Sequence, residues 1–128
     1  MADIVFTGQT PSAVIGSDEI PNNVDLEIYK GDYYEFFIEL QDESGSVVDI
    51  SSDTPKAQLR TNYDASDAVD LDTSIDDDGD IRIYISSQIC STLNPNVGYI
   101  WDLQTTNYKG DVKTWVTGDV TVLNEVTK

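Results

Sequence analysis

Apolar and polar residues alternate along most of the chain from Val24 onward, which is the pattern of β-strands that have one buried and one exposed face. In the first run Val24, Leu26 and Ile28 share one face. The second run predicts four side chains that point inward, Tyr34, Phe36, Ile38 and Leu40. Phe37 then points outward on the same strand, on the face that it shares with Glu35 and Glu39.

The rest of the chain keeps this two-residue period, with strands expected at 47–50, 57–63, 69–75, 81–85, 97–104 and 112–122. Only the stretch from Ser86 to Leu93 breaks the alternation, and its leading serine predicts a capped helical turn. About eight or nine short strands, separated by turns roughly every 8 to 12 residues, predict an all-β fold. We expect an antiparallel β-sandwich with one short helical turn.

The first 23 residues differ from this pattern, because glycines and prolines are scattered there among short apolar pairs. We therefore divide the chain into an N-terminal arm, residues 1–23, and a β-sandwich domain, residues 24–128. The arm is too apolar for a plain disordered tail, so we expect part of it to order against the domain or against a neighbouring chain. Its candidate contact residues are Ile4, Val5, Phe6, Val14 and Ile15.

The charge of the chain excludes several classes of partner. Lys and Arg number 7 against 24 Asp and Glu among 128 residues, which gives a formal net charge of -17. Nucleic acid and anionic membranes are bound by clustered Lys and Arg, so neither is expected as a partner. The chain shows no signal peptide and no segment of membrane-spanning length, which predicts synthesis in a cytoplasm.

The side-chain chemistry argues against catalysis. The chain has no His and a single Cys, which excludes an intrachain disulfide and removes the general base most easily tuned near neutral pH. We expect Cys90 to be a small core residue. No phosphate-cradling glycine loop, Cys pair or nucleophile elbow is present, so we predict neither an enzyme nor a bound cofactor.

One acidic turn, residues 76–80, matches part of the calcium-loop pattern. Aligning Gly79 with the invariant glycine places Ser74, Asp76 and Asp78 at ligand positions, but Ile85 stands where a bidentate Glu is required. We expect a solvated hairpin tip. A calcium site that uses Asp76 and Asp78 is the alternative, because hard cations accept carboxylate oxygens in flexible geometry.

Two aromatic residues, Phe37 and Trp115, fall on the exposed side of their strands by the alternation. Such residues often anchor interfaces, although both can also pack beneath the arm or a loop. An alternative function of a different class uses the same feature. Trp115, with the nearby Tyr108, Asp111 and Lys113, would form a platform for a carbohydrate on the host surface.

Several segments in order carry a resemblance to a known family. They are Lys-Gly-Asp at 30–32, Asp-Glu-Ser-Gly at 42–45, Asp-Gly-Asp-Ile-Arg-Ile at 78–83, Gly-Tyr-Ile-Trp-Asp-Leu-Gln at 98–104, Lys-Gly-Asp-Val-Lys-Thr at 109–114 and Gly-Asp-Val-Thr-Val at 118–122. The set, which spans roughly Ile28 to Thr127, resembles a small β-sandwich module of tailed bacteriophages. It is similar to the immunoglobulin-like N-terminal domain of baseplate upper proteins and to short stand-alone virion proteins. The arm lies outside the likeness.

The resemblance implies an immunoglobulin-like sandwich with a structural role in the virion and no catalytic residue. We expect a protein that docks onto a symmetric tail, baseplate or neck assembly, as part of a homo- or hetero-oligomer. Capsid decoration is the alternative position in the particle. Because the chain is so acidic, we expect its virion partners to offer a basic surface patch.

Overall fold

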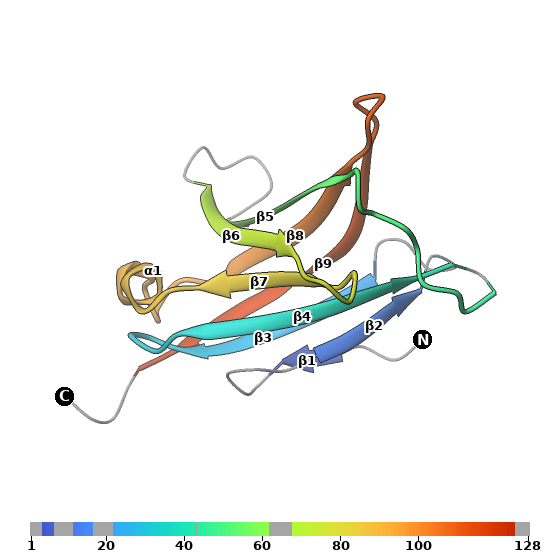
Figure 1. Cartoon of the computed structure of the whole chain (residues 1–128). Coiled ribbons are helices and arrows are strands. Elements are labelled where there is room, and N and C mark those ends of the chain that lie inside the picture. The colour runs from blue at the N-terminus through green and yellow to red at the C-terminus, as the bar shows by residue number, and fades with distance from the viewer. Residues whose placement is uncertain (1–3, 7–11, 17–21, 43, 62–67, 125–128) are drawn as a thin grey trace.

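The computed structural model describes residues 4–6, 12–16, 22–42, 44–61 and 68–124 of the chain. These residues form nine strands and one short helix (Figure 1). The strands are β1 (Ile4–Phe6), β2 (Ser12–Gly16), β3 (Asn22–Tyr29), β4 (Tyr34–Gln41), β5 (Thr54–Arg60), β6 (Val69–Ile75), β7 (Ile81–Ile85), β8 (Tyr99–Thr106) and β9 (Val112–Leu123), and the helix is α1 (Ser87–Thr92). The all-β prediction is therefore confirmed. Within the described residues, no helix is long and apolar enough to cross a membrane.

The strands form one mixed sheet in the order β1-β3-β9-β8-β5-β6-β7-β4-β2. The sheet curls until it nearly closes into a barrel (Figure 1). The bend lies in β6, which pairs with β5 through Val69 and Leu71 and with β7 through Asp72 to Ile75. Strand β6 therefore joins two halves of the fold that lie on opposite sides of one core.

The expectation of an entirely antiparallel arrangement is wrong for three pairings. β1 with β3, β3 with β9 and β2 with β4 are parallel. The cause is the path of the chain between the two halves. β3 and β4 are joined by a short turn, yet they belong to different halves and do not pair with each other. Each takes its partners from distant parts of the sequence instead.

The core contains the inward sets that the alternation predicts. In β4 buried and partly exposed positions alternate without a break, and Val24, Leu26 and Ile28 of β3 are buried as expected. The predicted helical turn is also present as α1. The Ser86 side chain accepts a hydrogen bond from the backbone N–H of Ile89 at 3.1 Å. Cys90 of α1 is fully buried, as predicted.

The arm contributes two edge strands to the sheet, because β1 pairs with β3 and β2 pairs with β4. Phe6 and Ile15 are buried in the core, and the Phe6 ring lies 5.1 Å from that of Phe36, centroid to centroid. The arm was expected to order against its own domain or against a neighbouring chain, and in this structure it packs against its own domain. The segment 47–50 is not a strand, since it makes only a single bridge between Val47 and Gln41.

Candidate functional site

Two of the predicted contact residues, Val14 and Phe37, lie on neighbouring strands and share the outer face of the sheet. β2 pairs with β4 so that Ser12 is opposite Phe37 and Val14 is opposite Glu39. The alternation predicted Phe37 on this face, and its side chain is partly exposed there. Val14 is 53% exposed. The pairing of the arm with β4 is what brings the two residues together.

More aromatic residues extend this face. Across the β4–β7 pair, Phe37 is opposite Arg82 and Glu35 is opposite Tyr84. The Arg82 guanidinium forms an ion pair with Glu35 and lies 5.0 Å from the centre of the Tyr84 ring. The Tyr33 ring lies 6.5 Å from that of Tyr84. We call the set Val14, Tyr33, Phe37, Arg82 and Tyr84 the attachment face.

The attachment face carries charged groups as well as apolar and aromatic ones. The Arg82 guanidinium is paired with the Glu35 carboxylate and also lies over the Tyr84 ring, so its charge is offset within the face. Glu39, opposite Val14, adds a negative charge at one end of the face. Aromatic side chains with arginine at the centre and charges at the rim are typical of protein interfaces.

Two alternatives were open for Trp115, exposure on the outer side of its strand or packing beneath the arm or a loop, and exposure is wrong. A β-bulge lies in the β8–β9 pair, where Leu103 is opposite Val116 and Gln104 is opposite Thr114, which leaves Trp115 as the extra residue. The bulge turns Trp115 inward, so that its side chain is 3% exposed. Its indole Nε1–H donates a hydrogen bond to Thr105 Oγ1 at 2.9 Å.

Trp115 is therefore not exposed as the carbohydrate platform predicted around it would require. The Lys113 ammonium lies 4.2 Å from the centre of the Trp115 ring, in the position that a sugar ring would need for stacking. Tyr108 is 80% exposed, but it stands at the tip of the β8–β9 turn, where the Lys109 ammonium lies over its ring. These residues do not form one stacking surface.

Two of the other arm residues, Phe6 and Ile15, do not face outward as contact sites. Phe6 and Ile15 fill the core of this chain, so neither is available to a neighbouring chain in this arrangement. The inward direction follows from the register, because Phe6 pairs with Leu26 and Ile15 pairs with Leu40, both of which are core residues. The side chains of Ile4 and Val5 lie outside the described residues, although their backbone belongs to β1.

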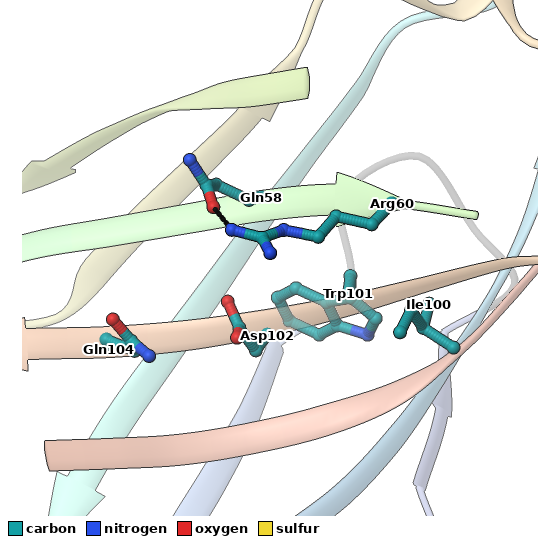
Figure 2. A pocket seen from close by; sticks show the side chains of 6 residues that line it. All are labelled: Gln58, Arg60, Ile100, Trp101, Asp102 and Gln104. Carbon is teal, nitrogen blue, oxygen red and sulfur yellow. Dashed lines mark hydrogen bonds between the residues drawn. The ribbon is translucent and has the colours of Figure 1, made fainter. Parts of the chain in front are cut away.

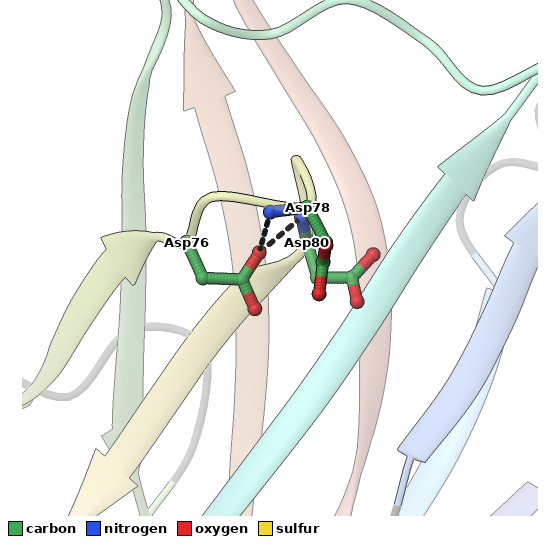
Figure 3. A group of neighbouring side chains, drawn as sticks. All are labelled: Asp76, Asp78 and Asp80. Atoms are coloured by element: carbon green, nitrogen blue, oxygen red, sulfur yellow. Dashed lines mark hydrogen bonds between the residues drawn. The ribbon is translucent and has the colours of Figure 1, made fainter.

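The acidic turn between β6 and β7 gathers three carboxylates, Asp76, Asp78 and Asp80 (Figure 3). One ligand atom from each lies within 4.8 Å of the others. Asp76 Oδ1 also accepts backbone hydrogen bonds from Asp78 at 3.0 Å and from Asp80 at 2.9 Å. Burial, followed by the charges of Asp76, Glu39 and Asp78, raises the pKa of Asp80.

The sequence pattern named Asp76 and Asp78 but missed Asp80. The calcium-loop alignment assigns ligand positions by fixed spacing, whereas the hairpin brings Asp80 back beside Asp76. The three carboxylates supply only part of the six to eight oxygens that calcium takes. The solvated hairpin tip that we expect for this turn and the alternative, a calcium site, both stay predictions.

A polar hollow of about 210 Å³ lies on the outer face of β5 and β8 (Figure 2). It is lined by Gln58, Arg60, Ile100, Trp101, Asp102 and Gln104. Arg60 Nη2 donates a hydrogen bond to Gln58 Oε1 at 2.8 Å. Burial raises the pKa of Asp102, while the charges of Arg60 and Lys56 act in the opposite direction. Sequence reasoning did not select this hollow, because the polar positions of two strands meet there only through their pairing.

No protein-family model matches the chain, and no curated protein matches its sequence.

Proposed function

We propose that this chain is a non-enzymatic structural protein of a bacteriophage virion, which docks onto a symmetric tail, baseplate or neck assembly. The attachment face is the observation that carries the docking role, and the resemblance of the segments between Ile28 and Thr127 to phage modules supports the virion role. A partner with apolar groups and a basic patch would bury Val14 and Phe37 and offset the acidic charge of the chain.

The arrangement of the strands supports an immunoglobulin-like version of the fold. Strands β2, β4 and β7 form one half, β5, β8, β9, β3 and β1 form the other, and β6 joins them. Tyr99, at the start of β8, accepts a hydrogen bond at its phenolic oxygen from the backbone N–H of Asn94 at 2.9 Å. A tyrosine that binds back to the chain just upstream at this corner is a hallmark of immunoglobulin-like sandwiches.

Quantitative mass spectrometry of purified particles tests the virion role. We expect the chain to be present at a low ratio to the major capsid protein, as a ring in the tail, baseplate or neck requires. A ratio near that of the capsid protein would instead make it a decoration protein. If the chain is absent from the particles, the proposed virion role is wrong.

A pair of matched variants tests the attachment face within the particle. Phe37→Ser removes the central aromatic group of the face, and we expect it to lower incorporation about tenfold. Tyr29→Ser is the control, because Tyr29 is an exposed aromatic residue on β3, in the other half of the sheet. Both variants should unfold at the same urea concentration as the parent chain. Equal incorporation of the two variants would show that docking uses another surface.

A further inference from the structure

Three connecting segments meet at one end of the fold. Ile38 of β4 is opposite Ile81 of β7, which places the β6–β7 turn beside the end of β4. Thr54 of β5 is opposite Thr106 of β8, which places the β8–β9 turn beside the start of β5. The connection from β4 to β5 therefore runs between the two turns (Figure 1). We call the described parts of these segments, together with the first two residues of β9, the loop end; it comprises residues 42, 44–53, 76–80 and 107–113.

Two hollows lie on either side of the β4–β5 connection. One, of about 360 Å³, lies between residues 47–51 and the β6–β7 turn, with Val47, Val48 and Ile75 among its walls. The other, of about 280 Å³, lies between the same connection and the β8–β9 hairpin, with Val48 and Val112 among its walls. Val48 lines both hollows. The loop end thus offers two adjacent recesses whose walls combine aliphatic groups with polar and acidic ones.

Exposed aliphatic groups mark the outer edges of these recesses. Val47 is 52% exposed and Val112 is 58% exposed, and each stands at a hollow of its own. Exposed valines scattered singly need no explanation, but these two flank the recesses that share Val48. A bound chain that entered both recesses would cover both valines.

The charge around the recesses is strongly negative. The loop end carries eight aspartates and two lysines among its described residues. Both lysines lie over aromatic rings of their own hairpin, Lys109 over Tyr108 and Lys113 over Trp115. Hydrogen bonds from the Ser44 hydroxyl and the Ser46 backbone lower the pKa of Asp42, so this carboxyl stays ionised at neutral pH.

We propose that the loop end docks a cationic protein segment in which lysine or arginine residues alternate with aliphatic ones. The aliphatic side chains enter the two recesses, and the cationic ones lie against the aspartates at their rims. Charge complementarity selects this occupant. An acidic segment would be repelled by the aspartates at the rims, and a neutral segment would leave their charge uncompensated. The surface is separate from the attachment face, and the inference does not depend on a virion role.

NMR titration of the full ¹⁵N-labelled chain tests the proposal with three capped synthetic peptides. One alternates lysine with leucine, one alternates lysine with serine, and one alternates serine with leucine. We expect the lysine–leucine peptide to bind at least about tenfold more tightly than either of the others, because each of those lacks one of the two contributions. The amide shifts should fall on the loop end.

Matched variants separate the aliphatic and the charged contributions. The double variant Val47→Ser/Val112→Ser should bind the lysine–leucine peptide about fivefold more weakly. Val14→Ser should not change the binding, because it replaces an equally exposed valine that lies on β2, outside the loop end. Asp77→Asn should weaken binding about twofold to fivefold. Asp72→Asn is its control, since Asp72 is an exposed aspartate on β6 away from the loop end. Phe37→Ser should leave peptide binding unchanged.

Several outcomes would overturn the proposal. Shifts spread over every acidic face, or equal binding of the lysine–serine peptide, would indicate counterion attraction alone. Binding at another face, or no binding, would exclude the loop end as the docking surface. Broadening of the loop-end signals with protein concentration alone would point to a second copy as the occupant. Displacement of the peptide by calcium chloride, with saturation at Asp76, Asp78 and Asp80, would point to an ion.

Discussion

Replacing Gly118 with alanine should destabilise the fold severely, because β9 approaches β3 closely at this residue. A Cβ added to Gly118 would lie 2.6 Å from the carbonyl carbon of Val24 and closer still to its oxygen. It would also lie 3.1 Å from Trp101 Nε1. The obstructing atoms of Val24 belong to backbone, so they cannot move aside as a flexible side chain can.

The same close approach holds a buried hydrogen bond. Trp101 lies opposite Gly118 in the β8–β9 pair, and its indole Nε1–H donates to the Val24 carbonyl oxygen at 2.7 Å. Separating β3 from β9 would strain or break this bond. Overpacking costs about 1–3 kcal/mol and an unsatisfied buried carbonyl a further 1–3 kcal/mol or so. We therefore expect Gly118→Ala to lower the free energy of unfolding by about 2–5 kcal/mol.

Equilibrium unfolding in urea, followed by far-ultraviolet circular dichroism, measures this loss. Gly98→Ala is the matched control, because nothing lies within 4 Å of a Cβ at Gly98. The control should change the free energy of unfolding by no more than about 0.5 kcal/mol. A loss for Gly118→Ala as small as that of the control would refute the close approach of β3 and β9.

Two further predictions concern titratable groups. Burial and neighbouring charges raise the pKa of Asp80 above its ordinary 3.8, so the folded state holds this proton more tightly than the unfolded chain and ionised Asp80 destabilises the fold. Asp80→Asn should therefore raise the free energy of unfolding at pH 7 by roughly 0.5 kcal/mol. Urea titrations at a pH below the ordinary pKa of 3.8 should show no such gain, because Asp80 is then protonated in both states. Equal gains at the two pH values would contradict the reasoning. Burial raises the pKa of Cys90 to about 12. A thiol reagent at pH 8 should react with it at least about a hundredfold more slowly in the folded chain than in urea, and comparable rates would show that Cys90 is accessible.

The sequence predicts local structure well where alternation is unbroken. The inward sets of β3 and β4 and the Ser86-capped turn follow from the residues themselves, because a strand with one buried face and a capped helical turn both leave local patterns. Trp115 is the instructive exception. Alternation counts residues on one strand, whereas a bulge is an insertion relative to the partner strand, so β9 alone does not reveal it.

The neighbours of each site residue could not be predicted from the sequence, because they lie on strands that are distant along the chain. Phe37 was placed on the correct face from β4 alone, but its neighbour Arg82 comes from β7, and the Arg82–Glu35 ion pair joins residues 47 positions apart. Asp80 was missed for a related reason, since the hairpin and not the spacing brings it beside Asp76. Local patterns place a side chain on a face, and the topology decides which side chains share that face.

The arm illustrates how one pairing assigns two roles to adjacent residues. Because β2 pairs in parallel with β4, Ile15 enters the core opposite Leu40 while Val14 is left exposed opposite Glu39. A shift of the register by one residue would exchange the two side chains and bury the valine. The arm residues therefore divide by face. Ile15 and Phe6 stabilise the domain, and Val14 extends the surface around Phe37 through which we propose the chain attaches.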